Sequence, residues 1–429
     1  MRPNAREVAG APFGLLGRTL GHSWSPRIHA TLGSAPYALF EREPNEVEDF
    51  VRNGDWRGIN VTIPYKRDAA LLADERSPRV ERLGVANTLV RMDDGRIWAD
   101  NTDVLGFSWM LERFLRNSLD QTSREALENK KVLVLGSGGA SQAVRAALED
   151  AGAIIVVISR SGNETYATLE ERHSDAALIV NTTPVGMYPK CPKSPISQHT
   201  LEALGNLRGV VDVVYNPERT GICMAAERLG IPCESGLAML VSQAFFSSQS
   251  FLGHDLDESL VDKIEADLRR QTRNVVLIGM PGCGKTSAGR KLARMVGRPF
   301  VDLDDTFVID HKTTPAQCIR TQGEDEFRRL ETKTAAAYGS GSGLVIACGG
   351  GIVTRERNYD LLHQNGTLVF LDRPLDELSS DDRPLSQTKG VRQLAAERMD
   401  AYNAWADLRI KCTGSSEGDA LLIRELLGL

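Results

Sequence analysis

The sequence has little of what marks a zinc-binding, secreted or membrane protein. Its seven cysteines among 429 residues are scattered, with no Cys-x-x-Cys pair and no alternation with histidine, which is typical of reduced thiols and gives no zinc site. No apolar stretch approaches the roughly 20 residues of a transmembrane helix. The N-terminal residues Met1 to Glu7 lack the apolar core of a signal peptide. We therefore expect a cytoplasmic protein without a membrane partner.

The chain also lacks an excess of basic charge. Its formal net charge is -6, so there is no global positive field for nucleic acid, and no nucleic-acid partner is expected. Internal repeats and low-complexity tracts are absent as well. A hydrophobic content of 41% and a charged content of 25% are ordinary for globular protein, and the length allows two or three domains.

Short apolar runs alternate with amphipathic stretches along most of the chain. Continuous apolar strands separated by helices indicate parallel sheets of the α/β class. Helices are predicted over 107–115 and over 255–270, the latter with acids early and Arg269 and Arg270 late, and domain boundaries near Gly106 and near 271–273. Buried strands are predicted at 132–135, 154–158, 178–180, 210–214, 275–278, 344–347 and 367–371.

One glycine-rich segment, Gly136-Ser137-Gly138-Gly139-Ala140-Ser141, follows a predicted strand. It resembles a dinucleotide-binding turn, because its first glycines permit a tight turn and close approach of a pyrophosphate to a helix N-terminus. Ser141 stands where the usual pattern has a third glycine or alanine, and such turns occur at other strand-to-helix joints. The next strand end reads Ser159-Arg160-Ser161. An arginine with hydroxyls suits the 2′-phosphate of NADP(H), unless Arg160 is a solvated surface residue.

A second segment, Gly279-Met280-Pro281-Gly282-Cys283-Gly284-Lys285-Thr286, followed by Ser287, matches a nucleoside-triphosphate loop. In such a loop the backbone amides wrap the phosphates, Lys285 neutralises the β and γ oxygens, and the Thr286 hydroxyl ligates Mg²⁺. Dinucleotides serve hydride transfer and triphosphates serve phosphoryl transfer. One chain with both motifs is therefore predicted to run two reactions.

An ordered series of further segments surrounds the first turn, and with it the chain up to about residue 270 resembles shikimate dehydrogenase. The segments are GHSWSPRIH at 21–29, NVTIPYK at 60–66, GVANT at 84–88, DNTDVLGF at 100–107, NTTPVGM at 181–187, DVVYNP at 212–217 and GLAMLVSQ at 236–243. The resemblance implies reduction of 3-dehydroshikimate to shikimate. A lysine is positively charged at neutral pH, so Lys66 is expected to polarise the carbonyl and supply or relay the proton, with Asp103 paired to it.

The resemblance also implies the other contacts of that site. Ser23 and Ser25 would bind the substrate carboxylate with Tyr215 nearby, although serines flanking a proline also cap helices. Its hydroxyls would be bound by Thr62, Asn87, Asp103 and Gln243, and the cofactor by Gly136, Gly138, Gly139, Ala140, Ser141, Ser159, Arg160, Ser161, Gly236 and Met239. Two departures from the family pattern stand out. The second cation after Arg160 is missing from Gly162-Asn163-Glu164, and Ala238 replaces a glycine.

From Asn274 onward the chain resembles shikimate kinase. The matching features are Phe300-Val-Asp302-Leu-Asp304, Gly323-Glu324 with FRRLE at 327–331, Gly349-Gly350-Gly351, Arg383-Pro384-Leu385, and Arg398 with Tyr402. The resemblance implies that ATP is bound by Gly279, Gly282, Cys283, Gly284, Lys285, Thr286, Ser287 and Arg383, Mg²⁺ by Thr286 and through water by Asp302, and shikimate by Asp304, Arg328, Gly349, Gly350, Gly351 and Arg398. Asp304 would orient or deprotonate the attacking hydroxyl, while the two arginines would grip the carboxylate unless they form helix-surface salt bridges.

The lid of this second half departs from the family. Leu378-Ser-Ser-Asp-Asp382 leads directly to Arg383, so the lid is shorter and carries two aspartates where positive charge would help. We expect three parts: a substrate domain at 1–105 completed by 236–270, a Rossmann-like NADP domain at 106–235, and a P-loop kinase-like α/β domain with a parallel sheet at 274–429.

The leading hypothesis is a bifunctional enzyme that makes shikimate and then phosphorylates its 3-hydroxyl. One alternative keeps the dehydrogenase and makes the C-terminal part a weak or regulatory nucleotide-binding module. Another is an NAD-using quinate/shikimate dehydrogenase, against which Ser23, Ser25 and Arg160 argue. A homodimer is left open as the assembly state.

Overall fold

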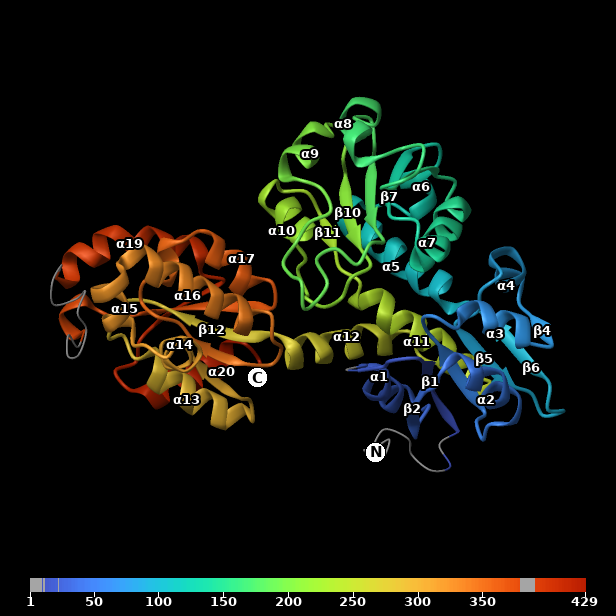
Figure 1. Cartoon of the computed structure of the whole chain (residues 1–429), viewed down its shortest axis with the longest axis horizontal. Helices are drawn as coiled ribbons and strands as arrows, with labels where there is room; N and C mark the ends of the chain where they lie inside the picture. Colours follow the sequence, from blue (N-terminus) through green and yellow to red (C-terminus); the bar gives the residue numbers. More distant parts are fainter. Residues whose placement is uncertain (1–9, 11, 22, 379–389) are drawn as a thin grey trace. The chain divides into compact units, whose positions relative to one another are not determined.

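The computed structural model describes residues 10, 12–21, 23–378 and 390–429 (Figure 1). They form two compact units, each described by itself. The first contains residues up to 184 together with 195–215 and 225–267, and the second contains 185–194, 216–224 and 268–429. In these described ranges no helix is both long enough and apolar enough to cross a bilayer.

The first unit contains a six-stranded sheet in the order β2-β1-β3-β5-β6-β4. It is mixed rather than parallel, because β5 runs antiparallel to both β3 and β6. Its strands are β1 (Phe13–Gly17), β2 (Tyr37–Glu41), β3 (Gly58–Val61), β4 (Glu75–Arg76), β5 (Thr88–Arg91) and β6 (Ile97–Asp100). The helices among them are α1 (Ser25–Leu32), η1 (Pro44–Glu46), α2 (Val47–Asn53), α3 (Lys66–Leu72) and α4 (Pro78–Leu83).

A parallel five-stranded sheet in the order β11-β10-β9-β7-β8 follows. Its strands are β7 (Lys131–Leu135), β8 (Ile154–Ile158), β9 (Leu178–Asn181), β10 (Gly209–Asp212) and β11 (Cys233–Glu234). The helices are α5 (Thr102–Leu119), α6 (Ser123–Leu127), α7 (Gly139–Asp150), η2 (Tyr166–Thr168), α8 (Leu169–Arg172), α9 (Gln198–Ala203), α10 (Gly221–Arg228), α11 (Leu237–Leu252) and α12 (Ser259–Thr272).

Helices α5 and α11 pack closely against each other. Gly106 lies at their contact, where an added Cβ would come within 2.7 Å of the backbone nitrogen of Gln243. Helix α5 runs unbroken through residues 105 and 106. The close packing brings the N-terminal turn of α5, which carries Asp103, beside the face of α11 that carries Gln243.

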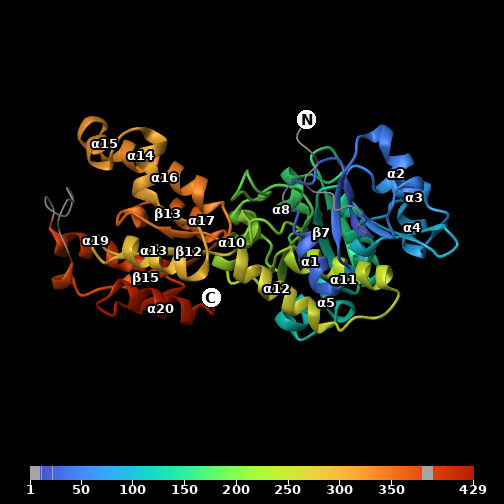
Figure 2. The same ribbon diagram turned by 90° about the horizontal axis from the view of Figure 1, so that it is seen from below.

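The second unit is built on a parallel sheet in the order β13-β14-β12-β15-β16. Alternate residues of β12 enter two different cores: Val276 and Ile278 pack with α16, α17 and α19, and Val275 and Leu277 pack with α13 and α20. Figure 2 shows α16 and α17 on one side of the sheet and α20 on the other. The strands are β12 (Asn274–Ile278), β13 (Phe300–Asp302), β14 (Val345–Ala347), β15 (Gly366–Asp372) and β16 (Leu408–Lys411). The helices are α13 (Lys285–Val296), α14 (Leu303–His311), α15 (Pro315–Gln322), α16 (Glu324–Gly339), η3 (Ile352–Thr354), α17 (Arg357–His363), η4 (Leu375–Glu377), α19 (Val391–Trp405) and α20 (Ser416–Leu426).

The α/β class is confirmed, and every strand predicted from an apolar run is present at that run. Boundaries shift where hydrogen bonding, rather than hydrophobicity, ends an element. Helix α12 begins at Ser259 instead of 255, because Oδ1 of Asp257 accepts a hydrogen bond from the Ser259 amide at 3.0 Å and caps the first turn. Strand β10 ends at Asp212, whose carboxylate bonds the amide of Val214 at 3.0 Å and turns the chain.

Candidate active sites

Lys66 and Asp103 form the centre of the first site. Lys66 is the first residue of α3, and its Nζ donates to Oδ2 of Asp103, in the first turn of α5, at 2.5 Å. The two side chains are 25% and 16% exposed, so the pair is partly shielded but reachable. The arrangement joins a proton donor to the carboxylate that orients it.

Asn87 fixes the other oxygen of that carboxylate. Its Nδ2 donates to Oδ1 of Asp103 at 2.9 Å and lies 3.5 Å from Oε1 of Gln243. Its Oδ1 accepts from the backbone nitrogen of Thr102 at 2.7 Å, which sets the orientation of the amide. The structure therefore brings together by direct hydrogen bonds four of the predicted residues: Lys66, Asn87, Asp103 and Gln243.

The predicted carboxylate-binding residues lie at the N-terminus of α1. Oγ of Ser23 accepts from the amide of Ser25 at 3.2 Å, but the N-cap residue is Trp24 and no side chain caps the helix, so the two serines are not its caps. Tyr215 packs against Trp24 with ring centroids 5.1 Å apart, and burial raises the pKa of its phenol. Thr62 follows β3, and its backbone carbonyl accepts from the amide of Tyr65, which precedes Lys66.

The glycine turn fits a dinucleotide phosphate. Gly136 has a φ of +102° and faces Thr183, so a side chain there would be strained and crowded. A Cβ on Gly138 or Gly139 would meet no atom within 4 Å, which leaves room beside the start of α7. Ser141 lies in the first turn of α7, and its buried hydroxyl has no hydrogen-bond partner among the described residues. Ala140 lies between them.

The predicted 2′-phosphate contacts follow β8. Arg160 and Ser161 are exposed, and the backbone of Ser159 bonds Glu164. Glu164 belongs to the segment 162–164, from which the second cation expected by resemblance is missing, and it pairs with Arg172 at 3.3 Å. That pairing lessens its repulsion of a phosphate.

Gly236 and Met239 frame the start of α11. A Cβ on Gly236 would clash with the backbone of Val213, so the position requires glycine by close approach. Ala238 lies within α11 and is fully buried, and a helical backbone accepts a residue with a Cβ. The departure at Ala238 therefore leaves the local backbone intact.

The phosphate loop opens the second site. Gly279, Gly282 and Gly284 all have positive φ, which bends the chain from β12 into α13. Nζ of Lys285 donates to the carbonyl oxygens of Gly279 and Met280 at 2.9 Å each. Cys283 is fully buried, and Ser287 lines the cavity described next.

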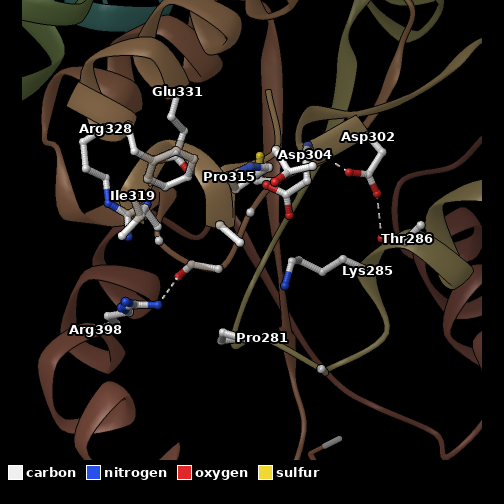
Figure 3. A pocket seen from close by; sticks show the side chains of 18 of the residues that line it. Pro281, Lys285, Thr286, Asp302, Asp304, Pro315, Ile319, Arg328, Glu331 and Arg398 are labelled. Atoms are coloured by element: carbon white, nitrogen blue, oxygen red, sulfur yellow. Dashed lines mark hydrogen bonds and ion pairs between the residues drawn. The ribbon is translucent and has the colours of Figure 1, made fainter. Parts of the chain in front are cut away.

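Thr286 and Asp302 form the predicted magnesium position. Oγ1 of Thr286 donates to Oδ2 of Asp302 at 2.7 Å, and Oδ1 of Asp302 accepts from the amide of Asp304 at 3.0 Å (Figure 3). Among the described residues no cluster of three or more His, Cys, Asp or Glu could hold a metal by itself. A hydroxyl and one carboxylate suit Mg²⁺ that keeps waters and phosphate oxygens as its other ligands.

A cavity of about 560 Å³ extends from the phosphate loop. Lys285, Asp304 and Arg398 point into it in Figure 3. Asp304 is exposed to the cavity but closely surrounded by protein, and burial, together with the neighbouring Asp302, raises the pKa of its carboxyl. The wall also contains Pro281, Thr314, Pro315, Ala316, Ile319, Phe327, Arg328, Glu331, Cys348, Gly349, Gly350 and Gly351.

Arg328 is buried but not free. Its Nη1 donates to Glu331 at 2.7 Å and its Nη2 to Glu324 at 3.3 Å, while Nε has no hydrogen-bond partner among the described residues. Arg328 thus forms salt bridges, but its side chain is 5% exposed, so they lie inside the cavity wall and not on the helix surface as the alternative expected. Burial raises the pKa of Glu331 despite the pairing. Sequence reasoning did not assign Glu331 a role; its spacing three residues after Arg328 on α16 was the available signal.

The glycine run brings backbone against five partners. A Cβ on Gly349 would lie 2.7 Å from Oδ1 of Asp304, one on Gly350 would lie 2.6 Å from Pro281, and one on Gly351 would clash with Arg328. The carbonyl of Gly350 accepts from Nη1 of Arg398 at 3.0 Å and from the hydroxyl of Tyr402. Arg383, a predicted ATP contact, lies outside the described residues, as do residues 379–382 of the predicted short lid.

An α/β chain with a dinucleotide-type turn, a lysine–carboxylate pair, and a phosphate loop beside an arginine-lined cavity combines a nucleotide-dependent oxidoreductase with a phosphoryl transferase. The chain belongs to the shikimate dehydrogenase family. The family model "Shikimate dehydrogenase substrate binding domain" matches residues 15–89, and the model "Shikimate kinase" matches residues 281–427. Both domains are therefore present in one chain.

Relatives of known sequence or structure match the first part of the chain. The shikimate dehydrogenase (NADP(+)) of Clostridium perfringens is 34% identical over 280 residues, which cover 60% of this chain and 98% of the relative. A chorismate mutase/shikimate 5-dehydrogenase fusion protein from Clostridium acetobutylicum is similar at a TM-score of 0.54 and 33% identity, covering 60% of this chain and 96% of the other. A quinate dehydrogenase from Corynebacterium glutamicum in complex with NAD is similar at a TM-score of 0.51 and 25% identity, covering 59% of this chain and 96% of the other.

Proposed function

We infer that the chain reduces 3-dehydroshikimate to shikimate with NADPH and then phosphorylates the 3-hydroxyl of shikimate with ATP and Mg²⁺. The observation that carries the first reaction is the contact between Lys66 and Asp103, supported by the NADP-dependent relative. The second reaction is supported by the cavity that joins the phosphate loop to Asp304 and two arginines. The two reactions share shikimate, which is the product of one and the acceptor of the other.

In the first reaction the residues of the chain bind the substrate and protonate the alkoxide formed from its carbonyl. NADPH, when bound at the glycine turn, supplies the hydride. Lys66 polarises the substrate carbonyl and gives the alkoxide its proton, while Asp103 holds the ammonium in position. Asn87 and Gln243 bind ring hydroxyls, and the hydroxyls of Ser23 and Ser25 bind the carboxylate.

In the second reaction the chain positions two substrates and offsets charge. Arg328 and Arg398 bind the carboxylate of shikimate, and Asp304 accepts the proton of the attacking hydroxyl. Its raised pKa suits a group that must take up a proton. Lys285 turns from the loop carbonyls to the transferred phosphoryl group. Thr286, and Asp302 through water, would hold Mg²⁺, which would offset negative charge on the phosphates.

The decisive experiment is a two-step assay on the whole chain with 3-dehydroshikimate, NADPH, ATP and Mg²⁺. We expect NADPH oxidation followed by shikimate 3-phosphate. The variant Lys66→Ala should stop the first step but phosphorylate added shikimate, and Lys285→Ala should accumulate shikimate. If the wild-type chain forms no shikimate 3-phosphate even when shikimate is added, the proposed second activity is refuted.

A second candidate for the first part is the use of NAD. The observation that favours it is Glu164, an acid in the segment where the family carries a second cation. Arg160 nevertheless favours the 2′-phosphate. Comparing kcat/KM for NADPH and NADH decides between them, and we expect the ratio to favour NADPH.

We also propose that the protein works in the cytoplasm. All seven cysteines are free, and both reactions use cofactors of central metabolism. Labelling all seven thiols in protein taken directly from cells without reductant tests this location.

A further inference from the structure

The direction of the nucleotide across the second site follows from the sheet order. The strands are parallel, so their carboxyl ends, where ligands bind in such sheets, lie at one edge. The acceptor residues Asp304 and Gly349 follow β13 and β14, and the phosphate loop follows β12. A triphosphate whose terminal phosphoryl group faces the acceptor must therefore extend its nucleoside end toward β15 and β16.

Arg373 is the first residue after β15, on that nucleoside side. Its Nη2 lies 3.8 Å from the position that a Cβ on Gly284 would occupy, so the guanidinium borders the phosphate loop directly. The side chain is 17% exposed, which leaves a small accessible face on an otherwise enclosed cation.

The contacts of Arg373 orient its guanidinium but leave part of its hydrogen-bonding capacity unused. Nη2 forms an ion pair with Oδ2 of Asp419 at 3.5 Å, longer than an N–H···O hydrogen bond of about 2.7–3.2 Å. Neither Nε of Arg373 nor Oδ2 of Asp419 has a hydrogen-bond partner among the described residues. The other oxygen of Asp419 accepts from the amide and hydroxyl of Thr413, at 2.6 and 2.9 Å. Asp419 is thus fixed by the loop after β16, and it holds the arginine beside Gly284.

We propose that Arg373 is a nucleotide-binding residue of the kinase half that pairs with the α-phosphate of ATP and ADP. The proposal rests on the kinase function inferred above. A guanidinium beside the loop glycine is close to where the first phosphate leaves the loop toward the nucleoside, and its fork of donors matches phosphate oxygens. It supplies a cation for the phosphates that does not depend on the lid.

The test measures binding of Mg·ADP to the full chain by titration calorimetry. Arg373→Met keeps the length of the side chain and removes the charge, and we expect its Kd to rise about tenfold. Arg373→Lys should recover part of that loss. The KM for shikimate should change by less than about twofold, because the acceptor lies on the other side of the loop.

The matched control is Arg409→Met. Arg409 pairs with Asp372 at 2.7 Å, where Asp372 ends the same strand β15, but the Arg409 side chain is 53% exposed and its Nη1 donates to Oδ1 of Asn403 at 3.2 Å. We expect its Kd for Mg·ADP to equal that of the wild type. An unchanged Kd in Arg373→Met, or an equal loss in Arg409→Met, overturns the proposal.

Repeating the titration with Mg·GDP separates phosphate pairing from base stacking. A contact to the α-phosphate weakens both nucleotides by the same factor, whereas a loss confined to ADP overturns the assignment to the phosphate. A structure of the wild-type chain with Mg·ADP needs no variant, and it should show a nitrogen of Arg373 within hydrogen-bond distance of an α-phosphate oxygen. Failure of the wild type to bind Mg·ADP would instead contradict the kinase function itself.

Discussion

Nδ2 of Asn87 donates a hydrogen bond to Oδ1 of Asp103 at 2.9 Å, and this contact sets the face that the carboxylate turns toward Lys66. Because Oδ1 of Asn87 is held by the amide of Thr102, the Asn87 side chain cannot simply rotate to make a different contact. Lys66, the proposed proton donor, is thus oriented by Asp103 and, through Asp103, by Asn87, whose side chain is held by the backbone of Thr102.

Replacing Asn87 by aspartate should disable the dehydrogenase. The new carboxylate oxygen would face Oδ1 of Asp103 in a buried position, and two like charges there repel and compete for Lys66. We expect kcat/KM for 3-dehydroshikimate to fall about 100-fold, or close to 3 kcal/mol. Asn53→Asp is the matched control, because Asn53 donates to Asp49 at 2.8 Å on the exposed surface. A wild-type rate in Asn87→Asp would show that the contact is not needed.

The pH dependence of phosphoryl transfer should reflect Asp304. Burial and the nearby Asp302 raise its pKa above the ordinary value of 3.8, so the acid limb of kcat should lie above that of an exposed carboxyl. The effect of Asp304 on stability has the opposite pH dependence to that of a salt-bridged acid. Its favourable contribution to the free energy of unfolding is present below pH 3.8 and is lost as the pH rises through the raised pKa.

The variant Asp304→Asn should therefore separate activity from stability. We expect turnover with saturating shikimate to fall by about 10²–10⁴. At pH 7 the thermal midpoint should not fall, because no charge has to be enclosed. Asp310→Asn, exposed on the same helix, should change neither quantity. A lower thermal midpoint in Asp304→Asn would count against the pKa argument.

Glu218 should stabilise the second unit above acidic pH. Although burial opposes ionisation, hydrogen bonding to Arg273 and the charges of Arg273 and Arg269 lower its pKa from 4.5 to about 2. Its contribution is complete above 4.5 and disappears as the pH falls toward 2. Glu218→Gln should lower the free energy of unfolding at pH 7 by at most about 3 kcal/mol, and by less at pH 3.

The control for Glu218 is Glu326→Gln. Glu326 pairs with Arg329 at 2.6 Å on the surface, where an ion pair contributes little. Chemical unfolding of both variants at the two pH values gives the comparison. Equal losses in the two variants would refute the role assigned to the buried group.

Removal of Mg²⁺ should stop only one of the reactions. The described residues supply Thr286 and Asp302 but no metal cluster of their own, so the ion depends on nucleotide phosphates for its remaining ligands. EDTA should abolish phosphoryl transfer and leave NADPH oxidation unchanged, and Mg²⁺ alone should give no heat in a titration of the chain. Tight binding of Mg²⁺ without nucleotide would contradict this expectation.

Local patterns predicted seven strands of the two parallel sheets and both glycine loops, because each is written in consecutive residues. The pairing of Lys66 with Asp103 was predicted only through the family resemblance, and the contact of Asn87 with Asp103 was not predicted, since these residues meet through the packing of separate elements. The mixed sheet escaped prediction because β5 is short and its apolar run carries no mark of direction.

Residues whose surroundings come from distant parts of the chain were not predictable. Glu331 lies three residues after Arg328 on the same helix, but it is buried by the glycine run that follows another strand. In the sequence Arg373 is an ordinary arginine after a strand. Its ion pair with Asp419, 46 positions later, is visible only in the folded structure.

The peptide of Gly350 has a consequence for the geometry of transfer. It touches Pro281 of the phosphate loop on one side, and on the other its carbonyl binds Arg398 and Tyr402. Under the proposed function, one peptide unit therefore acts as the spacer between Arg398, which would bind the acceptor, and the loop that would bind the donor. Since misplacing reacting atoms by about 1 Å can cost 100-fold in rate, the thickness of that spacer limits how far the two substrates can drift apart.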